Sequence, residues 1–157
     1  MDFKLNHLQK EIKCEEVGIA DLPALKFGHL EDGTMVFNAT AYLQSLNREE
    51  DYRQFSRGMR FWVERLATGY GVNPAKLFYA NPDGTELYHE ILTYIFVMYT
   101  DPDMISYFND LIDDVMTNGM AFSDSFIIEL ATTRLPEELL KPTIQVNGIT
   151  KNSSIRQ

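Results

Sequence analysis

The stretch Asp32-Gly33-Thr34-Met35-Val36-Phe37-Asn38-Ala39-Thr40 decides how the fold begins. Asp-Gly lies between two short apolar runs, residues 25–30 and 34–37, and this pattern predicts a β-hairpin because the turn needs a positive φ angle. Asn38 follows the second run, and its side chain can accept from the free backbone N–H groups at a helix start. We therefore expect a hairpin that leads through an Asn38 cap into a helix ending near Leu46.

The segment 51–70 has the clearest helical pattern in the chain. Its apolar residues lie at i, i+4, i+7 and i+11 and would share one buried stripe: Phe55, Met59, Trp62 and Leu66. We expect Trp62, the only tryptophan, in the core, because aromatic residues at helical spacing usually pack there. Three arginines lie on nearly the opposite side of the helix: Arg53, Arg57 and Arg60. We predict one helix with a buried face and an arginine face, ended by glycines 69 and 71.

Turn chemistry and hydrophobicity also divide the region from residue 77 to residue 117. Asn81-Pro82-Asp83-Gly84 separates two short apolar runs and predicts a second hairpin. Residues 90–99 are apolar almost all round, which is typical of a central buried helix. Asp101-Pro102 is typical of the cap and first residue of another helix, ending near residue 117. Its expected inner face consists of Met104, Ile105, Phe108, Leu111, Ile112 and Val115.

The two ends of the chain have weaker patterns. Residues 3–13 place apolar side chains at helix-like spacing, so a short N-terminal helix or arm is expected. A helix over 123–132, a turn at Pro136 and a β-strand over 143–150 are expected after Gly119. The predicted fold class is α+β, with a small helical core, two β-hairpins and a C-terminal helical extension. The predicted divisions are an N-terminal arm and first strand (1–31), a main domain (32–118), an extension (119–150) and a disordered tail (151–157).

The charge of the chain is acidic but uneven. The 157 residues fit one domain, and the formal net charge is -9. Residues 41–80 carry 6 basic against 4 acidic side chains, whereas residues 81–140 carry 1 against 12. Because each face presents its own local field, the acidic total does not exclude DNA binding. It does argue against strong non-specific binding to DNA at physiological salt.

Composition also bears on the compartment. Cys14 is the single cysteine, so no disulfide can form within the chain. The longest apolar run near residues 91–99 is much shorter than the roughly 20 residues that a membrane helix needs. The first seven residues lack the basic start and apolar stretch of a signal peptide. We expect a cytoplasmic protein that makes no membrane contact.

Several of these features, taken in order, resemble the KilA-N domain, a DNA-binding module of phage and large-virus proteins. That family has an Asn-Ala-Thr helix start, a tryptophan in the next helix, a histidine after a short strand, then an aromatic residue and a proline. The matching residues are Asn38-Ala39-Thr40, Trp62, His89, Tyr99 and Pro102. The resemblance extends from Asp32 to about Met116, but Leu87 and Glu90 replace a tryptophan and a proline of the family. It implies a KilA-N-like fold and an antirepressor-like, DNA-binding function for a phage or prophage protein.

The resemblance makes double-stranded DNA the expected partner. The arginine face and the hairpin at 81–84 would then form the contact surface, much as a helix and a wing do. The candidate DNA-binding residues are Asn38, Thr40, Arg53, Arg57, Arg60 and Lys76. Each has a structural alternative, since Asn38 is expected first as a helix cap and the arginines also suit a solvated helix face. His89 is expected to be a structural histidine with a satisfied ring nitrogen.

A second hypothesis assigns the function to the acidic face of residues 101–117. The aspartates expected to point outward there are Asp103, Asp110, Asp113 and Asp114. Such carboxylates can imitate phosphates and occupy a basic groove, so the alternative is a protein-binding regulator or inhibitor of a host or phage factor. Three of them have spacing that suits a hard cation, but a solvated acidic face is expected instead. No motif for catalysis, a cofactor or a metal is present, so no enzyme activity is expected. Whether the chain forms a homodimer is left open by the sequence.

Overall fold

A computed structural model describes residues 2–18, 22, 24–119, 121, 128 and 131–132. The chain divides into two compact units, Met1–Asp113 and Asp114–Gln157. The sheet and most of the helices belong to the first unit, and one long helix contributes residues to both. Of the helix expected over 123–132, only residues 128, 131 and 132 are described, and they are helical. The expected turn at Pro136, strand over 143–150 and tail over 151–157 lie outside the described residues.

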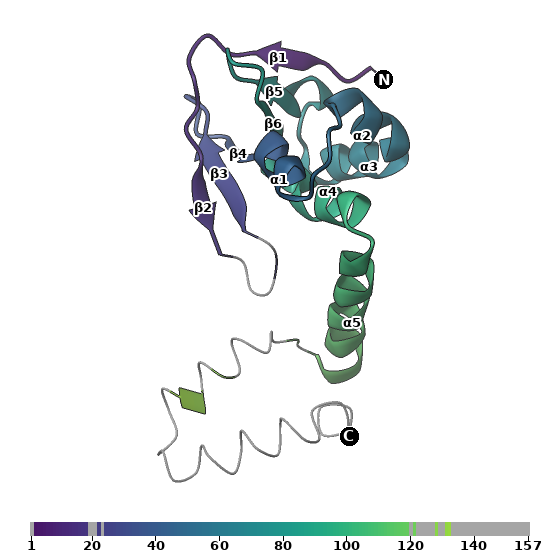
Figure 1. Cartoon of the computed structure of the whole chain (residues 1–157). Helices are drawn as coiled ribbons and strands as arrows, with labels where there is room; N and C mark the ends of the chain where they lie inside the picture. Colours follow the sequence, from purple (N-terminus) through teal and green to yellow (C-terminus); the bar gives the residue numbers. More distant parts are fainter. Residues whose placement is uncertain are drawn as a thin grey trace. The chain divides into compact units, whose positions relative to one another are not determined.

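One mixed sheet of six strands organises the first unit (Figure 1). Its strands lie in the order β1-β5-β6-β4-β3-β2. They comprise β1 (Leu5–His7), β2 (Glu15–Val17), β3 (Leu25–His29), β4 (Met35–Asn38), β5 (Phe78–Ala80) and β6 (Glu86–His89). Strands β1 and β5 are parallel, and all other neighbouring pairs are antiparallel. The predicted α+β class is confirmed, and β3–β4 and β5–β6 are the two predicted hairpins.

Both hairpin turns depend on a glycine with positive φ. Gly33 has φ +86° in the β3–β4 turn, and Gly84 has φ +90° in the β5–β6 turn. Each turn closes with a backbone hydrogen bond, from Leu30 N to Thr34 O at 2.9 Å and from Asn81 N to Thr85 O at 2.8 Å. Glycine adopts this backbone conformation without a Cβ penalty, which is why Asp-Gly located both turns correctly.

Five α-helices and two short 3₁₀ helices are present in the described part of the chain. They comprise α1 (Ala39–Ser45), α2 (Tyr52–Gly58), α3 (Arg60–Tyr70), η1 (Pro74–Lys76), η2 (Glu90–Leu92), α4 (Thr93–Thr100) and α5 (Asp103–Asn118). The predicted cap of α1 is confirmed, because Asn38 Oδ1 accepts from the backbone N–H of Ala41 at 2.8 Å. Gly71, with φ +67°, ends α3 as expected.

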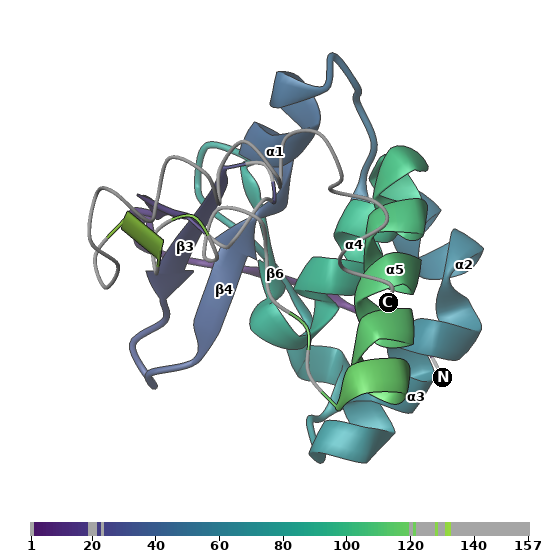
Figure 2. The same cartoon turned by 90° about the horizontal axis from the view of Figure 1, so that it is seen from below.

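The sheet is covered on both faces, as alternation along its strands requires. Phe37, Phe78 and Tyr88 belong to the main core together with buried residues of α2, α3 and α4. Figure 2 shows these three helices on one side of the sheet. The strand neighbours of the three aromatic residues, Val36, Tyr79 and Leu87, belong to a second cluster. Partly buried apolar residues between positions 8 and 30 cover this second cluster: Leu8, Ile12, Cys14 and Leu30. Successive side chains in a strand point to opposite faces, so one strand serves both cores.

The structure rules out the short helix that was one of the two expectations for residues 3–13. Leu5–His7 form β1 instead, in parallel register with Phe78–Ala80. The side-chain amide of Asn6 donates to Ala75 O at 2.7 Å and to Phe78 O at 3.0 Å. These partners lie about seventy positions away in the chain, so helix-like spacing of the apolar residues was a misleading local signal.

A second correction concerns the helix predicted over 51–70. It is interrupted at Met59, whose φ of -118° and ψ of 25° depart from helical geometry, and α2 and α3 form on either side. Val63 and Ala67 are therefore the fully buried residues of α3. Trp62 lies one helical step from Val63 and is 57% exposed, so the prediction that it packs in the core is wrong. The proposed stripe held only for Phe55 and, in part, for Met59 and Leu66.

The predicted central helix over 90–99 is present with a tighter start. Residues 90–92 form η2, and α4 follows with five buried residues. His89 is the structural histidine expected, since its Nδ1 accepts from the backbone N–H of Ile91 at 3.2 Å. Burial lowers the pKa of His89, which favours the neutral ring that can accept this bond.

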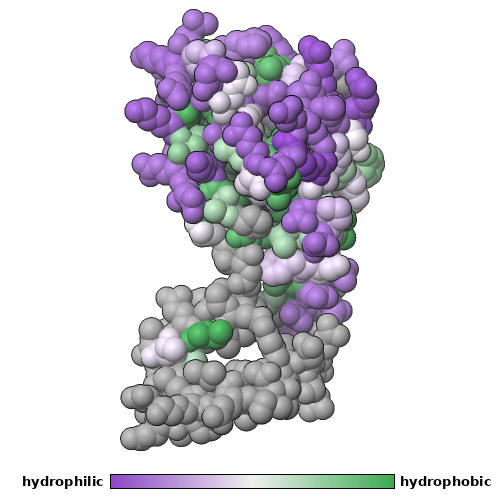
Figure 3. Space-filling model, viewed as in Figure 1, coloured by the Kyte–Doolittle hydropathy of each residue, from purple (hydrophilic) through white to green (hydrophobic). Residues whose placement is uncertain are grey.

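Helix α5 begins at the predicted place, and Asp101 Oδ1 accepts from the backbone N–H of Asp103 at 3.1 Å. Only part of its expected inner face is covered. Met104 and Phe108 pack on the main core, whereas three other apolar residues are exposed among the described residues: Ile105, Ile112 and Val115. In Figure 3, hydrophilic residues dominate the visible face of the described part of the chain, with smaller hydrophobic patches between them.

Replacing Phe55 and Trp62 separately by alanine tests the corrected helix phase. Phe55 is fully buried and contacts four other rings, so Phe55→Ala should lower the free energy of unfolding by about 3 to 5 kcal/mol. Trp62→Ala removes an exposed ring and should cost about 0.5 kcal/mol or less. Urea unfolding of both variants measures the difference, and equal losses would show that the assigned phase of α3 is wrong.

Candidate nucleic-acid interface

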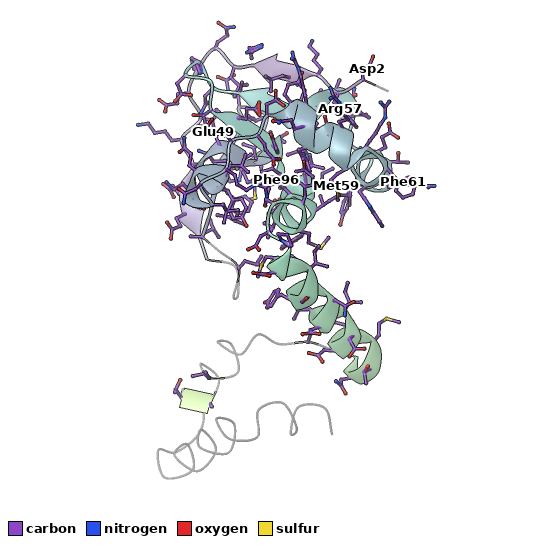
Figure 4. All side chains as sticks on the ribbon, turned by 45° about the vertical axis from the view of Figure 1, so that its right-hand side comes forward. Asp2, Glu49, Arg57, Met59, Phe61 and Phe96 are labelled. Atoms are coloured by element: carbon purple, nitrogen blue, oxygen red, sulfur yellow. The ribbon has the colours of Figure 1, made fainter. Side chains whose placement is uncertain are left out.

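The three predicted arginines lie around one shallow hollow. Arg53 and Arg57 belong to α2, and Arg60 is the first residue of α3. The hollow has a volume of about 280 Å³, and its other lining residues are Asp2, Phe3, Tyr52 and Ser56. Figure 4 shows Arg57 and Asp2 at the same edge of the first unit, with Phe96 inside it. The arginine side chains that the sequence placed on one helix face are thus brought together, although the helix itself is broken.

Two sets of hydrogen bonds fix the start of α2 and therefore the positions of the arginines on it. Asp51 caps the helix, accepting from Gln54 N at 3.0 Å, while the Gln54 side chain accepts from Asp51 N at 2.8 Å. Glu86, on β6, accepts from the backbone N–H of Tyr52 at 2.9 Å. The hydroxyl of Tyr88 donates to the same Glu86 oxygen at 3.0 Å. Glu86 thus connects the sheet with the first residue of the arginine-bearing helix.

The arginines differ in how far their charge is compensated. Arg60 forms an exposed ion pair with Glu64, with 3.0 Å between Nε and Oε1. The Arg53 guanidinium lies 5.8 Å from the centre of the Tyr52 ring. Arg57 makes no ion pair or hydrogen bond with any residue that the structure describes. Exposed pairs of this kind contribute only about 0.3 to 0.5 kcal/mol, so an incoming anion can compete for Arg60 as well.

Lys76, another predicted DNA-binding residue, does not line this hollow. It ends η1, and its positive charge helps to lower the pKa of Asp32 at the β3–β4 turn. The larger causes of that lowered pKa are hydrogen bonds from Thr34, including the one from its backbone N–H at 2.9 Å. Lys76 is therefore electrostatically associated with Asp32 and is not part of the arginine cluster.

Asn38 and Thr40 use their side-chain oxygens within the fold. Asn38 caps α1, as described above, and Thr40 Oγ1 accepts from the backbone N–H of Glu86 at 2.9 Å. Neither residue lines the arginine hollow. Both side chains thus have structural roles that account for their residue types, and each is only partly exposed.

The β5–β6 turn, predicted to act as a wing, is held against the N-terminal segment. Asn81 is buried, and its amide group exchanges two hydrogen bonds with the backbone of Ile12, at 2.9 and 3.2 Å. Asp83 accepts from Thr85 N at 2.9 Å, and this bond lowers the pKa of its carboxyl group. The turn therefore presents a carboxylate that stays ionised, which opposes contact with a phosphate.

The acidic alternative site lies on α5. Asp103, Asp110 and Asp113 are exposed, and Asp114 is half-buried. These aspartates lie opposite the apolar side of the helix that includes Phe108. No group of three His, Cys, Asp or Glu side chains that could hold a metal ion occurs among the described residues.

Two exposed aromatic residues next to the arginines were missed by the sequence reasoning. Phe61 and Trp62 follow Arg60 directly, and both are more than half exposed. Arg65 lies one turn further, with its guanidinium 5.3 Å from the centre of the Phe61 ring. The spacing of Phe61 and Arg65 at i and i+4 was a visible signal, but the supposed burial of Trp62 obscured it.

Glu86 offers a test of how α2 is held. Burial raises the pKa of the Glu86 carboxyl group. Its contribution to the free energy of unfolding is therefore fully present below the pKa of the unfolded chain, about 4.3, and is lost as pH rises through the pKa of the folded chain. Glu86→Gln keeps an acceptor for Tyr52 N–H but cannot ionise, so it should flatten the fall in stability above about pH 4.3. Glu86→Ala leaves donors unpaired and should cost about 1 to 3 kcal/mol.

Urea unfolding at a series of pH values measures both effects. Glu16→Gln, at an exposed glutamate of the edge strand β2, is the matched control and should retain the pH dependence of the parent chain. A Glu86→Gln variant whose stability still falls with pH like that of the parent would contradict the assignment.

Among the described residues, no helix combines the length and hydrophobicity needed to cross a bilayer. The chain matches no family model, no curated protein and no solved structure. The arginine hollow of α2 and α3 and the acidic side of α5 are charged surfaces of the described residues that could contact a ligand.

Proposed function

We propose that this chain is a non-enzymatic, DNA-binding regulatory protein of the KilA-N type, with an antirepressor-like role in the cytoplasm of a phage-infected or lysogenic host. The observation that carries the proposal is the convergence of Arg53, Arg57 and Arg60 around one hollow. The sequence resemblance between residues 32 and 116 supports the same function. Duplex DNA is the ligand, and the arginine side chains contact its phosphates.

The chemistry of the hollow suits a phosphate group. Guanidinium groups bind phosphate oxygens through charge-assisted hydrogen bonds, and they do so in a planar geometry that matches two oxygens. The Tyr52 and Ser56 side chains also line the hollow and add neutral polar groups. Arg57 has no competing partner among the described residues, so it is the arginine best placed to accept a phosphate.

The surrounding acidic groups limit the affinity. Asp2 lines the same hollow, and Glu64 pairs with Arg60. The net charge of -9 adds a long-range repulsion that salt screens. We therefore expect binding that is weak at physiological salt and clear at low salt, with few phosphates neutralised in each complex.

A second candidate function is favoured by α5. Asp103, Asp110 and Asp113 are exposed on the side of the helix away from its apolar residues. A row of carboxylates can occupy a basic groove on a protein by electrostatic complementarity. In this alternative the chain is a protein-binding regulator or inhibitor of a host or phage factor and does not bind DNA.

The salt dependence of duplex binding tests the first function. Three phosphate contacts should give a slope of log K against log salt near -2.7, at about 0.9 per phosphate. Arg57→Ala combined with Arg60→Ala should reduce the slope by roughly 1.8. Asp113→Asn combined with Asp114→Asn should leave binding equal or slightly tighter, since it removes repulsion. Fluorescence anisotropy with labelled duplexes provides the measurement.

A matched control uses exposed lysines that lie outside the hollow. Lys10→Ala combined with Lys26→Ala removes the same amount of charge and should leave the slope unchanged. Absence of duplex binding at about 50 mM salt would reject duplex DNA as the ligand. Capture of a basic protein that requires the aspartate pair, and tolerates loss of the arginine pair, would support the second.

A further inference from the structure

Helix α3 exposes an aromatic pair that the fold does not use. Phe61 and Trp62 are 59% and 57% exposed, although both are among the largest apolar residues of the chain. Their ring centres are 5.5 Å apart and the ring planes are at 84°. In an edge-to-face pair the indole loses at most one of its two faces to the phenyl ring. Phe61 therefore leaves at least one face of the Trp62 indole free to contact a ligand.

The pair lies on the exposed side of α3 and does not line the arginine hollow. Arg65 lies over the Phe61 ring at 5.3 Å and keeps its charge beside the aromatic pair. Figure 4 shows Phe61 pointing outward, away from the interior in which Phe96 lies. One cationic group and two aromatic rings thus share the exposed side of α3, whereas Arg60 lies about 160° around the helix from Trp62.

Exposed aromatic and cationic side chains on one surface suit single-stranded DNA better than duplex DNA. In a duplex the faces of the bases are stacked on one another, and only base edges, sugars and phosphates are accessible in the grooves. Unpaired bases expose their faces, which stack on aromatic side chains while the neighbouring phosphates contact cationic groups. An exposed indole, with Arg65 over the neighbouring Phe61 ring, has the charge and the shape for the second kind of ligand.

We propose that the exposed side of α3 binds single-stranded DNA, with an unpaired base stacked on Trp62 and an adjacent phosphate held by Arg65. This inference rests on the proposed DNA-binding function and adds an unpaired strand as its preferred ligand. Phe61 lies beside the indole, and the Arg65 guanidinium lies over the Phe61 ring. Stacking is tolerant of sequence, because every base has a π face, so the preference concerns strandedness more than base identity.

The single tryptophan makes the proposal directly measurable in the unmodified chain. Tryptophan fluorescence, excited selectively over that of the eight tyrosines, reports on Trp62 alone. Titration with an oligothymidylate of about 12 nucleotides, a length within the usual site size for single strands, should quench this fluorescence. A hairpin duplex with the same number of phosphates should bind more weakly and quench little.

Variants then separate stacking from simple charge attraction. Trp62→Leu keeps an apolar side chain but removes the π face, and it should weaken binding of the labelled oligothymidylate by roughly 5- to 150-fold. Trp62→Phe keeps an aromatic face and should retain most of the affinity. Tyr94→Leu, at an exposed aromatic residue of α4, is the matched control and should change affinity by less than about twofold. Circular dichroism establishes that each variant is folded.

The outcomes distinguish this inference from the function on which it rests. Absence of binding to either probe at about 50 mM salt would reject DNA binding as a whole. Binding of the duplex that equals or exceeds binding of the single strand, with Trp62 unquenched, would retain the proposed function and overturn the stacking proposal. A Trp62→Leu variant that captures single strands as well as the parent would also overturn it. Binding of a protein to this side of α3, without binding of either DNA probe, would likewise reject DNA binding.

Discussion

The packing of the Phe55 ring is the interaction on which the rest of the first unit depends. Its ring lies 5.8 Å from that of Tyr88 in a stacked arrangement and 5.1 Å from that of Phe96 in an edge-to-face arrangement. It also contacts Phe78 on β5 and Tyr99 on α4. One residue of a seven-residue helix thus joins two strands and the central helix. Since so short a helix has little stability of its own, tertiary packing of this kind is what orders α2.

The position of the arginines follows from that packing together with the Glu86 carboxylate. Phe55 sets the rotation of α2, so Arg53 and Arg57 are directed outward on its other side. Glu86 sets the start of the same helix through the N–H of Tyr52. The interruption at Met59 then turns α3 so that Val63 enters the core and Trp62 faces solvent. The exposed arginine and aromatic groups are therefore a consequence of how the core is packed.

Much of the fold could be predicted from sequence, because its signals were local. Asp-Gly turns and the Asn38 cap depend on residues within a few positions, and both hairpins and α1 were predicted correctly. Strand β1 could not be predicted, because its partner β5 is remote in the chain and no periodicity records a parallel pairing. The break at Met59 follows Gly58, the last residue of α2, and this helix-weakening glycine was a local signal that the predicted single helix over 51–70 did not take into account. Burial of Trp62 was predicted wrongly for this reason.

Only part of the candidate site could be predicted from sequence. That this site binds DNA can be measured directly. The arginine cluster could be predicted from helical spacing, because the three side chains stay together although the helix is interrupted at Met59. The positions of Lys76 and of the aromatic pair depend on tertiary packing, which spacing does not encode. Backbone amide chemical shifts of the ¹⁵N-labelled chain, recorded with and without DNA, locate the surface directly. The account predicts that the largest changes fall on residues 53–65. Changes confined to residues 103–114, or no changes at low salt, would contradict it.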